Sequence, residues 1–73
     1  MPNNDRMICI NKIEQSIGAT EKIITYMAEI KEIFLDDEKK FQRSHQALKD
    51  QADIIAEIAL MLQNALKQYR STF

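Results

Sequence analysis

Few side chains in this 73-residue sequence combine a reactive type with a spacing that suggests chemistry, and Cys9 is the first of them. It lies in the apolar run Met7–Ile10, with Arg6 close by. A thiol becomes reactive where positive charge or a helix N-terminus stabilises its thiolate. The flanking isoleucines, Ile8 and Ile10, favour a buried structural cysteine instead. One cysteine also excludes a disulfide within the chain.

The second group combines His45, the only histidine, with a short row of carboxylates. An imidazole that titrates near neutral pH suits a pH-sensitive helix contact. Asp50, Asp53 and Glu57 follow at helical spacing, but metal sites in helical bundles add histidines from facing helices. We therefore expect a solvated face, with no catalytic residue, metal or cofactor, and predict that the protein is not an enzyme.

The third group is the only basic cluster, Lys39, Lys40 and Arg43, with Phe41 among them. In a dimer of hairpins these residues are a possible nucleic-acid contact, through the phosphates of RNA or DNA. The acidic residues at positions 36–38 cancel this charge locally. With ten basic and eleven acidic residues, the whole chain does not favour a nucleic-acid partner.

An apolar residue recurs every seven positions along most of the chain, and a second row follows four residues after it. Paired 3/4 spacing is typical of a helix that packs lengthwise against another helix. With one glycine and one proline, the sequence predicts an all-α fold. The predicted inter-helix core consists of Ile13, Ile17, Ile24, Met27, Phe34, Phe41, Leu48, Ile55, Leu62, Leu66 and Tyr69.

We expect a single domain over residues 1–73, an antiparallel two-helix hairpin that completes a bundle with a second chain. The first arm covers about 5–34, capped at Asn4 or Asp5, the turn about 35–37, and the second arm about 37–71. Gly18 marks a possible kink, although a continuous helix through it is equally compatible with the sequence. The competing interpretation is one long helix from about Thr20, because the heptad row passes the proposed turn in phase.

The second arm carries more apolar surface than one contact needs. A helix that is apolar almost all round is expected to be in contact on several sides. Exposed apolar patches of such size usually mark protein contacts. The predicted partner interface consists of Ile23, Ile30, Ile54, Ile58, Met61 and Ala65.

The sequence thus predicts a protein-interaction module, a chaperone-like adapter or assembly factor that buries an amphipathic helix of its own copy or of another protein. Alternatives are a self-assembling structural subunit and a hairpin dimer that binds RNA or DNA. A two-arm chain whose second helix runs through residues 67–73 resembles, in layout, small helical co-chaperones and needle-type subunits of type III secretion systems. It also resembles the RNA-binding hairpin dimers that control plasmid copy number. We expect no membrane span and a cytoplasmic location.

Overall fold

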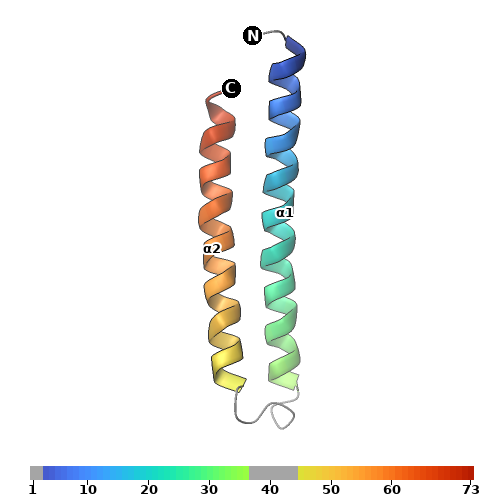
Figure 1. Cartoon of the computed structure of the whole chain (residues 1–73). Helices are drawn as coiled ribbons and strands as arrows, with labels where there is room; N and C mark the ends of the chain where they lie inside the picture. Colours follow the sequence, from blue (N-terminus) through green and yellow to red (C-terminus); the bar gives the residue numbers. More distant parts are fainter. Residues whose placement is uncertain (1–2, 37–44) are drawn as a thin grey trace.

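The chain folds as two long antiparallel helices, α1 (Asn3–Asp36) and α2 (His45–Ser71), which pack side by side (Figure 1). The structure, a computed structural model, describes residues 3–36 and 45–73. The predicted all-α hairpin is confirmed, and the alternative of one long helix is wrong. The C-terminus of α2 lies beside the N-terminal part of α1, which projects beyond it (Figure 1).

The helix bounds differ from the predicted ones near the turn. α1 continues through Asp36, so the chain does not turn at residue 35. The predicted caps Asn4 and Asp5 lie inside the first turn of α1, where the Asp5 carboxylate is favourable at the positive end of the helix. The predicted start of the second arm at residue 37, and Phe41 with it, lie outside the described residues.

Each helix turns one row of side chains toward the other, with the alternating 3/4 spacing of a helix pair. We call these the contact rows. In α1 the row contains Ile10, Ile13, Ile17, Thr20, Ile24, Met27, Lys31 and Phe34, all buried or half-buried. In α2 it contains Lys49, Ala52, Ala56, Ala59, Gln63, Leu66 and Arg70, also buried or half-buried.

Two ion pairs across the hairpin define how the helices are aligned. Lys31 pairs with Asp53, and the Arg70 Nε–H donates to Glu14 Oε1 at 2.6 Å. In both pairs the residue numbers add up to 84, so residues with that sum lie at one level of the antiparallel hairpin. The residue numbers of Thr20 and Gln63, both buried, add up to 83, so they lie within one residue of the same level and place two polar side chains between the helices. The Thr20 hydroxyl donates to the Ile17 carbonyl at 2.6 Å.

The predicted core is right for α1 and mostly wrong for α2. Ile13, Ile17, Ile24, Met27 and Phe34 lie in the contact row of α1, and Leu66 lies in that of α2. Four predicted core residues of α2, however, are 40–56% exposed: Leu48, Ile55, Leu62 and Tyr69. Here α2 presents its alanines to α1, because small side chains allow two helices to approach closely. The larger side chains are thereby turned to one side.

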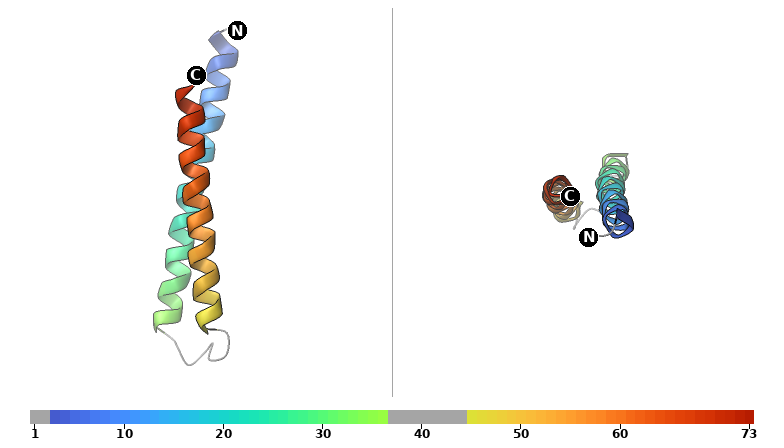
Figure 2. Two further views of the ribbon diagram at one scale, coloured as in Figure 1. Left: turned by 90° about the vertical axis from the view of Figure 1, so that its left-hand side faces the viewer. Right: turned by 90° about the horizontal axis from the view of Figure 1, so that it is seen from above.

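The hairpin is elongated and encloses only a narrow core between its two helices. Its radius of gyration is 17.0 Å and its extents are 58 × 15 × 12 Å, whereas a compact 73-residue domain has a radius of about 11 Å. Its accessible surface is 5739 Å², about 1,100 Å² more than the ~4,650 Å² of a compact monomer of this mass. Figure 2 shows two helices side by side, with no further described element over either face.

Gly18 does not break α1, which continues through it without a positive φ. Apart from its chain neighbours and the backbone of its own helical turns, a methyl group at this position would meet no atom within 4 Å. We therefore expect Gly18→Ala to raise the free energy of unfolding by about 0.5–1 kcal/mol, since alanine lowers the entropy of the unfolded chain. Urea denaturation followed by circular dichroism measures the change. A loss of stability would show that something packs closely over Gly18.

Candidate interaction surface

The two flanks of the contact rows differ sharply in polarity. Successive helical residues are rotated by about 100°, so the residues just before and just after a contact row project to opposite sides. Because the helices face each other and run in opposite directions, the preceding positions of both helices project to the same side of the hairpin. The same holds for the following positions. Each side of the hairpin is therefore built from both helices.

The preceding positions form what we call the apolar face. From Ser16 to Ile33 on α1, and over the whole of α2, no charged residue holds such a position. The large apolar side chains of this face are each exposed by 38–59%. They are Ile23, Tyr26, Ile30, Ile33, Leu48, Ile55, Ile58, Leu62 and Tyr69. Exposed apolar side chains gathered over two helices indicate an interaction site.

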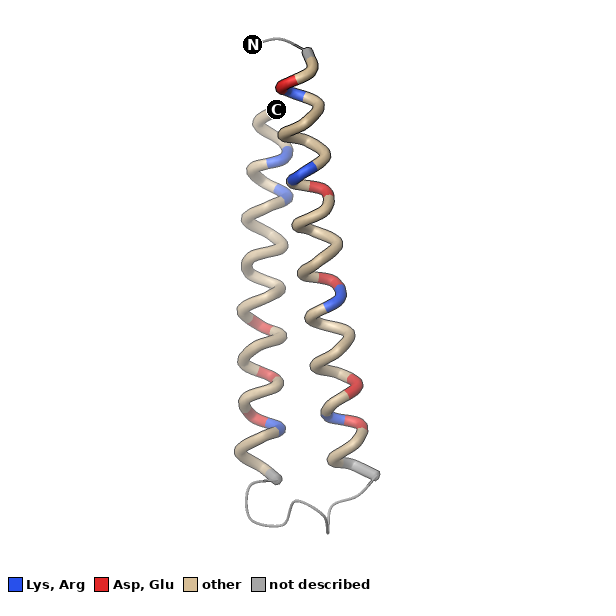
Figure 3. Tube along the Cα trace, turned by 45° about the vertical axis from the view of Figure 1, so that its right-hand side comes forward, with Lys and Arg blue, Asp and Glu red and all other residues tan. Residues whose placement is uncertain are grey.

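The following positions form the opposite, charged face. It carries Glu14, Glu21, Asp53 and Glu57, and both ion pairs use a carboxylate from it. Figure 3 shows that charges occur all along α1, whereas the middle of α2, from residue 58 to residue 66, has none. The charged side chains of this face are well solvated, whereas the apolar face has no charged side chains over the stretches given above.

All six residues of the predicted partner interface are exposed in the hairpin. Ile23, Ile30 and Ile58 lie on the apolar face. Ala65, which precedes Leu66, also lies on the apolar face. Helical spacing places Ile54 and Met61 farther round α2, on its outer side, so the apolar surface continues there. Their role in binding stays a prediction. Sequence reasoning missed Tyr26 and Ile33, although both precede a contact-row position of α1.

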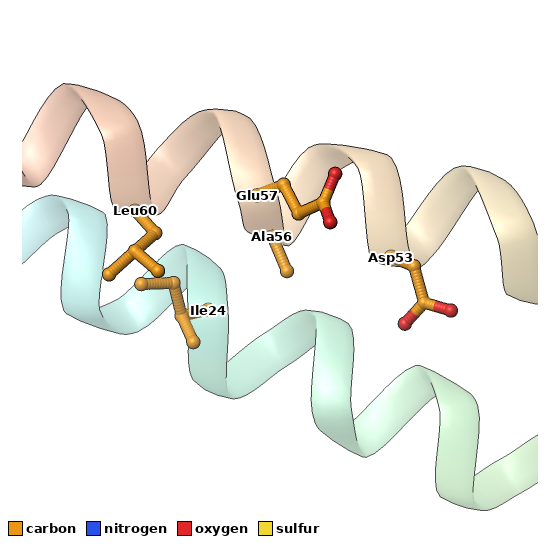
Figure 4. A pocket seen from close by; sticks show the side chains of 5 residues that line it. All are labelled: Ile24, Asp53, Ala56, Glu57 and Leu60. Atoms are coloured by element: carbon orange, nitrogen blue, oxygen red, sulfur yellow. The ribbon is translucent and has the colours of Figure 1, made fainter.

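A shallow pocket of 360 Å³ lies toward the charged face, lined by Ile24, Asp53, Ala56, Glu57 and Leu60. In Figure 4 the side chains of Ile24 and Leu60 point toward each other, and the two carboxylates lie apart from them. Asp53 is already paired with Lys31. The polar side chains lining the pocket are the carboxylates of Asp53 and Glu57.

Two further candidates for chemistry, Cys9 and Asp50, lie at opposite ends of the hairpin. Cys9 is half-buried and unpaired as a disulfide. Asp50 accepts a hydrogen bond from Gln46 Nε2 at 2.8 Å, within the exposed surface of α2. Over residues 3–36 and 45–73, no group of three potential metal ligands is present. The basic cluster Lys39, Lys40 and Arg43 lies outside the described residues.

Comparison of the chain with protein-family models, curated proteins and solved structures finds no match. Within the described ranges, neither helix has an apolar stretch long enough to cross a membrane. The feature of the described residues that bears on function is the apolar face.

Proposed function

We propose that this chain is a non-enzymatic protein-interaction module, a chaperone-like adapter or assembly factor, whose apolar face packs against an amphipathic helix of another polypeptide. That polypeptide is a second copy of the chain or a different helical protein. The observation that carries the proposal is the segregation of exposed apolar side chains to one face of both helices, with the ion pairs' carboxylates on the other.

The dimensions of the apolar face suit a helix as the ligand. On α2 it extends from Leu48 to Tyr69, a length of about 30 Å at 1.5 Å per residue. A helix laid along the groove between two apolar helices contacts both of them at once, in the helix-in-groove mode of recognition. Such packing removes apolar area from water at about 25 cal/mol per Å², less the cost of association.

Site-specific photo-crosslinking tests this proposal whichever polypeptide the partner is. Ile58 and Asn64 are both exposed residues of α2 and occupy mirror-related positions on the apolar and the charged face. With a benzophenone amino acid at either position, produced in the cells that make the protein, we expect crosslinks to a polypeptide from position 58. The variant at position 64 is the matched control and should give few.

Equal crosslinking from both positions, or none from position 58, would contradict the proposal. Crosslinking to nucleic acid in place of protein would do the same, and would favour the nucleic-acid interpretation of the sequence. A monomer that stays folded at micromolar concentration and crosslinks to nothing would leave no interaction for the face to serve.

A further inference from the structure

The apolar face is symmetric about one level of the hairpin. On α1 the apolar residues of this face, which run from Ala19 to Ile33, have Tyr26 at their centre. On α2 the stretch from Leu48 to Tyr69 is centred next to Ile58. The numbers of Tyr26 and Ile58 add up to 84, so both centres lie at the same level. A two-fold axis perpendicular to the helices can pass through that level. It places a second copy of the hairpin, with its turn at the opposite end, over the whole length of the apolar face.

The net charge of α2 changes sign along its length, which favours this orientation. At its start Asp50, Asp53 and Glu57 outnumber Lys49, and near its end the charged residues of α2 are Lys67 and Arg70, of which Arg70 is paired with Glu14 of α1 (Figure 3). Most of these side chains lie on the charged face, so they act on the second copy at long range. Two copies of α2 packed antiparallel bring each acidic end to the other's basic end. If the two turns lie at the same end, α2 instead packs on α1 of the copy. The end of α1 near the turn carries Glu29 and Glu32 against one lysine, Lys31, so two acidic ends then meet.

The surface available matches what a dimer requires. The hairpin exposes about 1,100 Å² more than a compact monomer of its mass. A standard protein interface takes about 800 Å² from each partner. Two hairpins packed face to face form a four-helix bundle. In that bundle the accessible surface area of each chain falls to about that of a compact protein of its mass.

We infer that the occupant of the apolar face is a second copy of this chain, bound face to face with the two turns at opposite ends of a four-helix bundle. This inference rests on the proposed function and names its partner. Tyr26 and Ile58 then lie next to the two-fold axis, each close to its counterpart in the other copy. Ile54 and Met61, on the outer side of α2, remain at the rim.

A distance between spin labels tests both the occupant and its orientation. Gln46 lies near the start of α2 and is exposed, so a label on Gln46→Cys in a Cys9→Ser chain disturbs little of the interface. In the proposed dimer the two labels are about 40 Å apart, from about 12 residues of helix on either side of the axis. With the turns at the same end, the labelled helices are diagonal neighbours, and labels on the two outward charged faces are about 25–30 Å apart.

Sedimentation equilibrium of the same labelled protein gives the number of copies. A dimer with labels near 40 Å supports the inference. A dimer with labels below about 30 Å overturns the antiparallel orientation, and filaments or a stable monomer overturn the closed dimer. A monomer that is nevertheless crosslinked through position 58 to another protein in cells refutes only the second copy and leaves the proposed function standing.

Discussion

Leu62→Asp should abolish association of this chain through its apolar face, whereas Leu60→Asp should leave association almost unchanged. The two leucines are two residues apart on α2 and equally exposed in the hairpin, 51% at Leu62 and 49% at Leu60. Leu62 lies on the apolar face and Leu60 lines the pocket of the charged face. Comparing the two substitutions thus separates the loss of partner binding from any loss of stability of the hairpin itself.

The expected loss of binding free energy in Leu62→Asp has two parts. The aspartate removes about 1 kcal/mol of apolar burial and places a carboxylate without a partner in the interface, at a cost of about 2 kcal/mol or more. Because tenfold in affinity is about 1.4 kcal/mol, the dissociation constant should rise at least 100-fold. We expect less than about threefold for Leu60→Asp.

Analytical ultracentrifugation over a concentration series measures both variants, with circular dichroism to compare their helix content. Equal weakening by the two substitutions would mean that the apolar face is not where the partner binds.

Ala59→Leu should destabilise the hairpin by about 1–3 kcal/mol, the usual cost of forcing extra methylenes into a close contact. Ala59 is only 4% exposed and lies in the contact row of α2, where its small side chain lets α1 approach. A leucine there pushes the two helices apart. Urea denaturation gives the change in free energy of unfolding.

The matched control is Ala28→Leu, at an exposed position of α1. Its effect should stay within about 0.5 kcal/mol, as for most surface substitutions. Should Ala59→Leu be neutral or stabilising, the alanines of α2 would not face α1, and the rotation of α2 described above would be wrong.

Part of this fold could be predicted from the chain alone. The heptad spacing from Ile13 to Phe34 predicts the apolar residues of the contact row of α1, although a second apolar stripe with the same period runs beside it through Ile23 and Ile30. The lack of glycine and proline between the arms, together with the in-phase row, left one long helix open. The structure resolves this in favour of the hairpin.

The rotation of α2 could not be predicted in the same way. α2 has two neighbouring stripes, one of alanines with Gln63 and Leu66, and one of large residues such as Ile55 and Leu62. Burial of apolar area alone favours the larger side chains at the helix contact. Close approach of two helices favours the smaller ones. The heptad spacing of α2 fits both stripes and does not decide between these two effects.

The exposed side chains of α2 then have a consistent interpretation. A hairpin that places alanines inside and isoleucines outside leaves its larger apolar residues for a contact with another chain. The predicted interface residue Ile58 and the wrongly assigned core residues Ile55 and Leu62 belong to the same surface. The residues that were wrongly assigned to the core are therefore part of the apolar face.

Hydroxyl-radical footprinting of Leu62 against Leu60 tests most directly whether the apolar face is covered by another polypeptide. In an isolated hairpin the two side chains, exposed by 51% and 49%, should be oxidised at nearly the same rate. With the face covered, Leu62 should be oxidised several times more slowly than Leu60, in the purified protein at concentrations where it associates and in an extract of the cells that make it. Equal oxidation of the two leucines under both conditions would contradict the account.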